Sequence, residues 1–275
     1  MDAPAKINLA LDILGKRSDG FHDLRMVMQS VSLCDAVELR ETEEPGFRLL
    51  SGFVPAGRQS LEQRAAEAFF QAVGRPMPGL EVTLGKRIPA YAGLGGGSAD
   101  VAALLRLLQK RYAPDMPRET LEAIGLRVGS DVPFCLRRGT CLAEGRGERL
   151  SPLPPLPPCW VVLWKPDFDL PTPQMFALAD RTELQKRPDF PAIEAALAAG
   201  SLAGVAKELC NVFEEVLPEA QRRRVEEIKR TLLSRGALGA AMSGSGPTVF
   251  ALFEEQAAAE EALSKGCFLA RPVQV

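Results

Sequence analysis

Residues 89–100 have the sequence Pro-Ala-Tyr-Ala-Gly-Leu-Gly-Gly-Gly-Ser-Ala-Asp, so four glycines fall within five positions. A backbone without side chains can close its N–H groups around an anion. Apolar residues at spacings of three and four then predict a helix over residues 99–112, with Ser98 as its N-cap and Asp100 in its first turn. A glycine-rich loop that opens a helix favours bound phosphate, because unpaired N–H groups and the helix dipole both attract negative charge.

Two common phosphate-binding loops do not match this segment. The P-loop requires a lysine after its last glycine, and none follows here. The dinucleotide-binding fingerprint requires a third glycine where this chain has Ser98. On the residues alone, an ordinary glycine turn ahead of a buried helix remains the alternative.

A phosphoryl transfer to a hydroxyl also needs a group that accepts the proton. The turn Gly-Ser-Asp at residues 129–131 precedes an apolar run that predicts a strand over residues 134–141, so Asp131 would be a carboxylate in fixed geometry. A structural turn or cap role is the alternative for this aspartate. In an expected strand over residues 5–13, Lys6 and Asn8 share one face, which indicates a site unless Lys6 lies in solvent at the strand end.

Six motifs occur along the chain in an order that is typical of one family. They are Pro-Ala-Lys-Ile-Asn-Leu at 4–9, Asp-Gly-Phe-His at 19–22, the glycine-rich segment, Gly-Ser-Asp-Val-Pro-Phe at 129–134, Leu-Pro-Thr-Pro at 170–173 and Met-Ser-Gly-Ser-Gly-Pro-Thr at 242–248. In this order they resemble the GHMP small-molecule kinases. The finer marks are similar to those members that act on cytidine diphosphate-linked methylerythritol, and the resemblance covers residues 4–253.

The resemblance implies an α+β fold of two domains, an N-terminal β/α domain and a C-terminal ferredoxin-like α/β sandwich, with the active site in the cleft between them. It implies ATP as co-substrate and phosphorylation of the 2-hydroxyl of the cytidine diphosphate-linked methylerythritol in isoprenoid precursor biosynthesis. Mg²⁺ is expected to be carried with ATP, because the sequence has no dedicated carboxylate cage and the ion usually rides on substrate phosphates. Another GHMP kinase acting on mevalonate, homoserine or a sugar is the first alternative, and a non-catalytic nucleotide-binding regulator is the second.

The resemblance also distributes roles among residues. Lys6 and Asp131 match the catalytic lysine and aspartate of the family. ATP binding falls to Pro89, Ala90, Tyr91, Ala92, Gly93, Leu94, Gly95, Gly96, Gly97, Ser98 and Ala99, substrate binding to Asn8, Phe21, His22, Thr172 and Phe176, and an active-site loop to Ser243, Gly244, Ser245 and Gly246.

Several of these residues have ordinary structural alternatives. Phe21 stands where the family more often has tyrosine, so ring stacking on the cytosine persists but a phenolic hydrogen bond does not. From local sequence alone, His22 also suits a surface or core position, and Phe176 suits a helix core. The loop 243–246 also suits a plain strand connector. Lys86, just before the glycine-rich segment, suits either a nucleotide contact or a solvated strand end.

Composition indicates a globular protein without an electrostatic footprint for nucleic acid or anionic membrane. The chain has 275 residues, 46% hydrophobic and 25% charged, with a formal net charge of −2. Its six cysteines form no metal-binding or disulfide pattern, which favours a reducing compartment. With no signal peptide and no apolar stretch of membrane-spanning length, a cytoplasmic location is expected.

A proline-rich segment at residues 151–158 predicts a domain boundary. We therefore expect an N-terminal ATP-binding domain over residues 1–150 and a C-terminal domain over residues 151–275. Further helices are expected at 60–72, 119–128, 173–179, 190–198, 219–235 and 256–264, and further strands at 27–31, 36–40, 80–84, 160–164, 239–242 and 248–253, with one more strand at the end.

Overall fold

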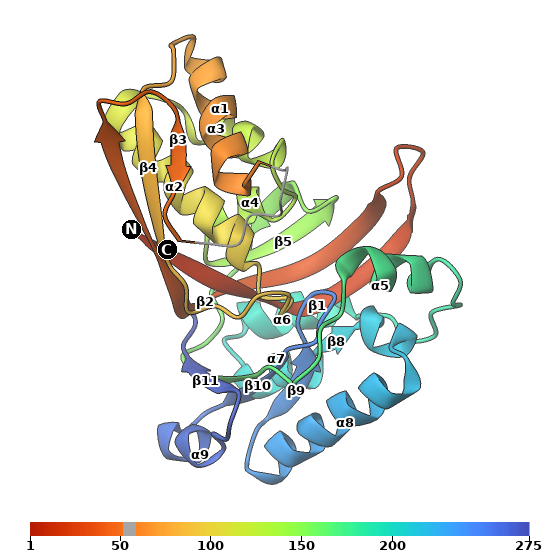
Figure 1. Ribbon diagram of the computed structural model, residues 1–275. Helices are drawn as coiled ribbons and strands as arrows, with labels where there is room; N and C mark the ends of the chain where they lie inside the picture. Colours follow the sequence, from red (N-terminus) through yellow and green to blue (C-terminus); the bar gives the residue numbers. More distant parts are fainter. Residues whose placement is uncertain (52–58, 275) are drawn as a thin grey trace. The chain divides into compact units, whose positions relative to one another are not determined.

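A computed structural model describes residues 1–51 and 59–274 of the chain (Figure 1). Contacts divide the chain into two compact units, each of which gathers segments that are distant in the sequence. Unit 1 comprises Met1–Ala5, Cys34–Ile88 and Gly95–Arg137, whereas unit 2 comprises Lys6–Leu33, Pro89–Leu94 and Arg138–Val275. The glycine-rich segment thus contributes residues to both units. The expected domain boundary after residue 150 stays a prediction.

Unit 1 combines helices with strands. Its helices are α1 (Leu61–Val73), α2 (Gly96–Tyr112), α3 (Arg118–Leu126) and α4 (Val132–Arg137), and α2 contacts the other three. Strand β4 (Gly79–Gly85) pairs antiparallel with the second half of β2 (His22–Thr42) and parallel with β3 (Phe47–Leu49). The predicted apolar face of α2 is confirmed as core, since Val101, Leu104, Leu105 and Leu108 are fully buried.

The first group of strands in unit 2 surrounds the N-terminal strand. From Lys6 onward, β1 (Asp2–Lys16) belongs to this unit and pairs in parallel with the short β8 (Cys210–Asn211). The first half of β2 pairs antiparallel with β5 (Thr140–Gly145), which pairs in turn with β6 (Arg149–Pro152). Strand β1 is buried from Ala3 to Ile13, so a polar side chain on it lies inside the protein and needs a partner.

A second sheet in unit 2 has the strand order β11-β7-β10-β9, with all neighbours antiparallel. These strands are β7 (Trp160–Trp164), β9 (Gly239–Met242), β10 (Val249–Phe253) and β11 (Cys267–Ala270). Helix α8 (Glu219–Ser234) contacts β9 and β10, and α9 (Gln256–Glu261) contacts β7 and β10 (Figure 1). The sequence of elements β7-α8-β9-β10-α9-β11 with this strand order is the ferredoxin-like arrangement, as predicted.

The remaining elements of unit 2 lie between β7 and α8 in the chain. They are α5 (Thr172–Ala179), α6 (Phe190–Ala198), α7 (Leu202–Lys207) and a 3₁₀ helix at Val212–Val216. The predictions for α5, α6 and α8 are confirmed to within one residue at each end. Three short elements were not predicted: helix α7, strand β8 and the 3₁₀ helix. Each is too short for a hydrophobic period to be recognised in the sequence.

Two element predictions were wrong. The run expected as a strand at 134–141 instead forms helix α4 over Val132–Arg137, followed by β5 from Thr140. Pro133 is accommodated at the second helical position, where its missing N–H has no intrahelical partner to lose. The strands expected at 27–31 and 36–40 are one continuous strand, β2.

The start of α2 also differs from the prediction. The helix begins at Gly96 rather than Ala99, and its N-cap is Gly95 with φ 71°, so Ser98 lies inside the first turn and is not the cap. Gly95 adopts a left-handed backbone conformation, which costs glycine no steric strain, and the helix therefore starts at the next residue. Asp100 consequently lies beyond the first turn and is buried. Its carboxyl group must therefore be stabilised by another side chain rather than by the helix dipole.

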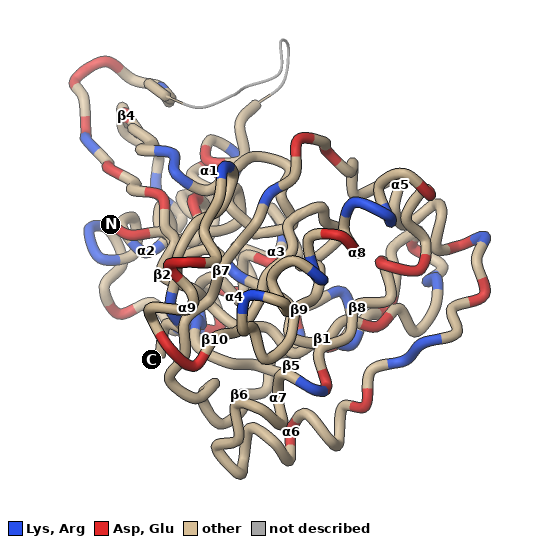
Figure 2. Tube along the Cα trace, turned by 90° about the horizontal axis from the view of Figure 1, so that it is seen from below, with Lys and Arg blue, Asp and Glu red and all other residues tan. Residues whose placement is uncertain are grey.

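Charges of both signs are interspersed along the trace (Figure 2). Arg222, Arg223 and Arg224 are exposed on α8, as expected for a solvated helix face. Within the described residues, no helix combines the length and hydropathy that crossing a membrane requires.

Candidate functional site

Lys6 and Asn8 lie side by side on β1 in the interior of unit 2. Only 4% of Lys6 and none of Asn8 is exposed, so the alternative that Lys6 projects into solvent is wrong. The Lys6 Nζ donates a hydrogen bond to Asn8 Oδ1 over 2.8 Å. The backbone N–H of Gly244 donates to the same oxygen over 2.9 Å. Asn8 therefore orients the Lys6 ammonium and attaches it to the second glycine loop.

The second glycine loop, residues 243–246, packs against the first part of the glycine-rich segment within unit 2. Ser243 Oγ donates to the carbonyl oxygen of Gly93 over 3.0 Å. Gly93 has φ 74°, and a Cβ at this position would overlap the carbonyl oxygen of Ser243. A Cβ on Gly244 would lie 3.0 Å from Lys6 Nζ. Glycine is thus required at both positions for the two backbones to approach each other.

Asn211, which the sequence analysis missed, holds this loop through hydrogen bonds to its backbone. Its Nδ2 donates to the carbonyl oxygens of Met242, over 2.7 Å, and Gly244, over 2.8 Å. Its Oδ1 accepts a hydrogen bond from the N–H of Phe213 over 3.0 Å. An asparagine inside the apolar run Leu-Cys-Asn-Val-Phe was the available signal, because a buried amide needs several hydrogen-bond partners.

The second half of the glycine-rich segment lies in unit 1 and forms the start of α2. The first N–H groups of a helix have no intrahelical partners, and here they belong to residues without side chains or with a small one. A Cβ on Gly96 would lie 3.1 Å from Ile88 Cγ2, and one on Gly97 would lie 3.2 Å from Leu61 Cδ1. The backbone is therefore enclosed on the protein side and leaves its N–H groups for an anion.

The turn that carries Asp131 lies beside this helix start within unit 1. A Cβ on Gly129 would lie 3.5 Å from Ser98 Oγ. Asp131 is half-buried and immediately precedes α4, and its carbonyl oxygen accepts the N–H of Cys135 over 3.0 Å. The turn that contains Asp131 thus approaches the start of α2 through Gly129.

A charged cluster joins three elements of unit 1. Lys86, which follows β4, donates to Asp100 Oδ2 on α2 over 2.6 Å and forms an ion pair with Asp35 on β2. Both carboxylates are buried, with 1% exposure each. Burial raises the pKa of Asp100 to about 7; Lys86 opposes this rise, whereas the charge of Asp35 adds to it. The two carboxylates raise the pKa of Lys86 despite its partial burial, so Lys86 is held in ion pairs, although 36% of its side chain is exposed.

Asp100 should make the stability of the protein depend on pH. Since its pKa is raised from 3.8 to about 7, the folded chain keeps a proton that the unfolded chain releases. The stability from this group is complete below about pH 4 and is lost as pH rises through about 7. Asn at this position does not titrate, so the Tm of Asp100→Asn minus that of wild type should increase from about pH 5 to about pH 8. Parallel Tm profiles would contradict this, and the exposed Asp115→Asn is the control.

The predicted base-binding residues partly converge in unit 2. The His22 and Phe176 rings stack with centroids 4.5 Å apart and planes at 20°. Phe176 also makes an edge contact with Phe213, with centroids 5.0 Å apart. Phe21 lies apart from this stack, 48% exposed, with the Arg146 guanidinium 3.8 Å from its ring centroid. Sequence reasoning thus found the His22–Phe176 pair and missed Phe213 and Arg146.

His22 is held by a carboxylate that the sequence analysis did not single out. Its Nε2 lies 2.6 Å from Asp180 Oδ1, and Asp180 also pairs with Lys16 over 2.5 Å. The hydrogen bonds to His22 and Lys16 lower the pKa of Asp180, so this carboxylate is ionised at neutral pH. Thr172, at the start of α5, shares a 2.8 Å hydrogen bond with Ser245 Oγ, which links the second glycine loop to the helix that carries Phe176.

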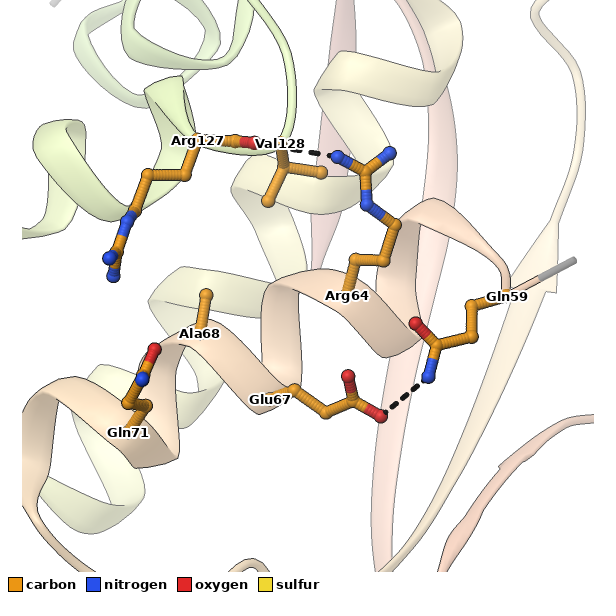
Figure 3. Close-up of a pocket in the computed structure, with 7 residues that line it drawn as sticks. All are labelled: Gln59, Arg64, Glu67, Ala68, Gln71, Arg127 and Val128. Atoms are coloured by element: carbon orange, nitrogen blue, oxygen red, sulfur yellow. Dashed lines mark hydrogen bonds between the residues drawn. The ribbon is translucent and has the colours of Figure 1, made fainter.

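A groove of about 580 Å³ lies elsewhere on unit 1, beside α1 (Figure 3). Two of its polar side chains have hydrogen bonds within the groove: Arg64 donates to the backbone carbonyl oxygen of Arg127, and Gln59 donates to Glu67. None of the motif residues lines this groove, so we do not assign it to the site.

Comparison with known proteins gives the class of this chain. The family described as GHMP kinases N terminal domain matches residues 60–139, and GHMP kinases C terminal matches residues 192–269. A relative from Exiguobacterium sibiricum (strain DSM 17290 / CCUG 55495 / CIP 109462 / JCM 13490 / 255-15) is 44% identical and covers 92% of this chain and 88% of its own length. A relative from Citrifermentans bemidjiense (strain ATCC BAA-1014 / DSM 16622 / JCM 12645 / Bem) is 42% identical. It covers 98% of this chain and 96% of its own length. Both are named 4-diphosphocytidyl-2-C-methyl-D-erythritol kinase.

Solved structures agree with these relatives. A crystal structure of 4-(cytidine 5'-diphospho)-2C-methyl-D-erythritol kinase superposes with a TM-score of 0.82 at 33% identity, covering 100% of this chain and 99% of that one. L. major mevalonate kinase in complex with R-mevalonate shares the fold, with a TM-score of 0.75 at 17% identity, covering 100% and 96%. The two-domain α+β fold and its glycine loops define a kinase that transfers phosphate from ATP to a small molecule. The chain belongs to the GHMP kinase family, and the alternative of a non-catalytic regulator is set aside.

Proposed function

We propose that this kinase phosphorylates the 2-hydroxyl of 4-diphosphocytidyl-2-C-methyl-D-erythritol in the non-mevalonate route to isoprenoid precursors. The observation that carries the proposal is the stacked His22–Phe176 pair with Asp180 behind it. Mevalonate, homoserine and sugars have no base to stack, so the pair is unexplained for those substrates. The names of the relatives at 42–44% identity support the same substrate.

His22 is suited to distinguish pyrimidines by its second ring nitrogen, Nδ1. The Asp180 carboxylate at Nε2 fixes the ring orientation and requires a proton on that nitrogen, so Nδ1 is left for the edge of the base. At positions 3 and 4 of the ring, cytosine has an acceptor and a donor, whereas uracil has a donor and an acceptor. A single hydrogen-bonding atom of the protein can therefore distinguish the two bases. Stacking alone does not, because every base has a π-face.

In the proposed reaction the oxygen of the substrate 2-hydroxyl attacks the γ-phosphorus of ATP, and ADP leaves. Asp131 accepts the proton of that hydroxyl. The N–H groups at the start of α2 bind the phosphates, and the Lys6 ammonium stabilises charge on the transferring oxygens. Mg²⁺ carried with ATP would supply further charge neutralisation.

A substrate panel tests the proposal directly. The enzyme is supplied with ATP and, in separate reactions, the cytidine-linked compound, its uridine analogue, free methylerythritol, mevalonate and homoserine, and the products are identified by phosphorus NMR. We expect a new phosphate monoester only, or far faster, with the cytidine-linked compound. Equal rates with mevalonate or homoserine would make the chain a GHMP kinase of another specificity.

Phe176→Ala should raise KM for the cytidine substrate by about 5- to 150-fold, because stacking of a base on an aromatic ring contributes roughly 1–3 kcal/mol. KM for ATP should remain within about twofold. Steady-state kinetics with each substrate varied in turn measure both constants. The control is Phe190→Ala, which removes another buried phenylalanine of unit 2 that contacts Arg25 rather than His22. It should lower Tm without changing either KM, and the same KM pattern in both variants would contradict the base site.

A further inference from the structure

The cluster of Lys86, Asp35 and Asp100 connects the two ends of the glycine-rich segment. Lys86 and the two residues after it lead into that segment from β4, whereas Asp100 lies on α2, which the segment opens. Asp35 belongs to neither of these elements and lies on β2. All three residues are in unit 1, so the cluster joins the strand before the loop to the helix after it.

Asp35 binds the backbone as well as the side chain of the approach to the loop. Its Oδ1 accepts the N–H groups of Arg87, over 2.5 Å, and Ile88, over 2.8 Å, while Oδ2 pairs with the Lys86 ammonium. With an exposed fraction of 1%, its geometry is set by these partners. One carboxylate thus fixes the conformation of three consecutive residues immediately before Pro89.

This fixed segment lies close to Gly96, at the start of the helix that is proposed to bind phosphate. A Cβ on Gly96 would lie 3.1 Å from Ile88 Cγ2 and 3.6 Å from Lys86 Nζ. Any movement of Ile88 or Lys86 would therefore displace the first turn of α2 or leave space beside it. The N–H groups proposed to bind phosphate belong to the same turn.

The polar groups of the cluster are not all satisfied, which argues against a role in stability alone. One ammonium serves two buried carboxyl groups, and Asp100 Oδ1 is buried without a hydrogen-bond partner among the described residues. Buried ion pairs are weak sources of stability, because desolvation offsets their attraction, and an unpartnered buried oxygen adds a further cost. The arrangement is better explained by what it positions.

We propose that Asp35 is a positioning residue for nucleotide binding, which joins the two ends of the glycine-rich segment through Lys86, Asp100 and the N–H groups of Arg87 and Ile88. This inference deepens the proposed function and rests on the same phosphate-binding loop. Asp35 itself touches no substrate in this scheme. It keeps the N–H groups at the start of α2 in binding geometry before ATP arrives, so that their alignment costs little on binding.

Variants at Asp35 separate its two kinds of bond. Asp35→Asn keeps an oxygen for the N–H groups of Arg87 and Ile88 but removes the charge that pairs with Lys86, whereas Asp35→Ala removes both. Lys86→Met keeps the length of the side chain and removes the ammonium. Should Asp35→Ala fail to fold, the other two variants still test the proposal.

The control is a second part-buried ion pair of unit 1, which joins helices α3 and α4. Arg137 on α4 binds Glu122 on α3 through two nitrogens at 3.0 and 3.1 Å, with side chains 21% and 13% exposed. Glu122→Gln removes one charge from this pair, as Asp35→Asn does from the cluster. Both variants should lower Tm, so Tm alone does not distinguish positioning from structure.

Affinity for a non-hydrolysable ATP analogue, measured by calorimetry on the whole protein, is the deciding readout. We expect Asp35→Ala to weaken this affinity by about 10- to 100-fold, and Asp35→Asn and Lys86→Met by less, because misplacement of binding groups by about 1 Å is costly. KM for the alcohol substrate should stay within about twofold. Glu122→Gln should leave the nucleotide affinity unchanged.

Unchanged nucleotide affinity in a folded Asp35→Asn and Lys86→Met would overturn the proposal, as would an equal loss in Glu122→Gln. The binding measurement needs no second substrate. A wild type that binds the ATP analogue but does not phosphorylate the cytidine-linked compound would refute the proposed substrate and leave this test intact.

Discussion

Asp131→Asn is expected to lower kcat by roughly 10²-fold or more, with a smaller change in KM for either substrate, because general-base catalysis contributes about that factor. The amide keeps the size of the side chain but does not accept the hydroxyl proton. Gly129, in the same turn as Asp131, lies beside Ser98 at the start of α2. Single-turnover kinetics with saturating ATP separate the chemical step from product release.

Lys6→Met should reduce kcat over the same range, and the double variant should cost less than the two single effects combined. Non-additivity is expected where two groups serve one transition state. Circular dichroism and nucleotide calorimetry of each variant establish that the fold and ATP binding persist. A kcat near that of wild type in either folded single variant would remove that residue from the proposed mechanism.

Gly95→Val and Gly96→Val are expected to weaken ATP affinity by at least about 10²-fold, because the loop must approach the phosphates without side chains. Gly95 has φ 71°, which strains any residue with a Cβ, and a Cβ on Gly96 would already press on Ile88. Calorimetry with the ATP analogue measures the loss. Tm should fall only modestly, since both residues lie at a helix end.

Gly74→Val is the matched control for backbone strain. Gly74 ends α1 with φ 65°, and a Cβ there would meet nothing within 4 Å. This variant should lower Tm by a similar amount and leave ATP affinity as in wild type. If all three variants lose ATP affinity together, the effect is one of stability and the phosphate site lies elsewhere.

The fold was most predictable where periodicity and punctuation agree. β7, α6 and β9 occur over the expected residues, since each is a clear apolar or amphipathic run between proline, glycine or aspartate. Helix α4 was mistaken for a strand because its residues Val132–Leu136 are buried on all sides, and such a run has no helical period to detect.

The site was predictable in its residue types but not in its partners. Lys6, Asn8, His22 and Phe176 were found from motifs, and the structure brings each into contact with a residue of the expected site. Asp180, Asn211 and Asp35 were missed. Each acts through a partner at least 31 positions away in the chain, and no local pattern in one sequence encodes such a distance.

The chain contains one histidine, and that histidine is the side chain stacked on Phe176. A protein labelled with ¹⁵N therefore yields one pair of imidazole nitrogen resonances, whose identity needs no assignment of the remaining residues. Nitrogen chemical shifts differ strongly between protonated, bare and hydrogen-bonded ring positions, so titration with cytidine and uridine nucleotides would follow the Nδ1 and Nε2 signals separately. Under the proposed function, His22 would thereby report which pyrimidine edge is bound, without an attached probe or an activity assay.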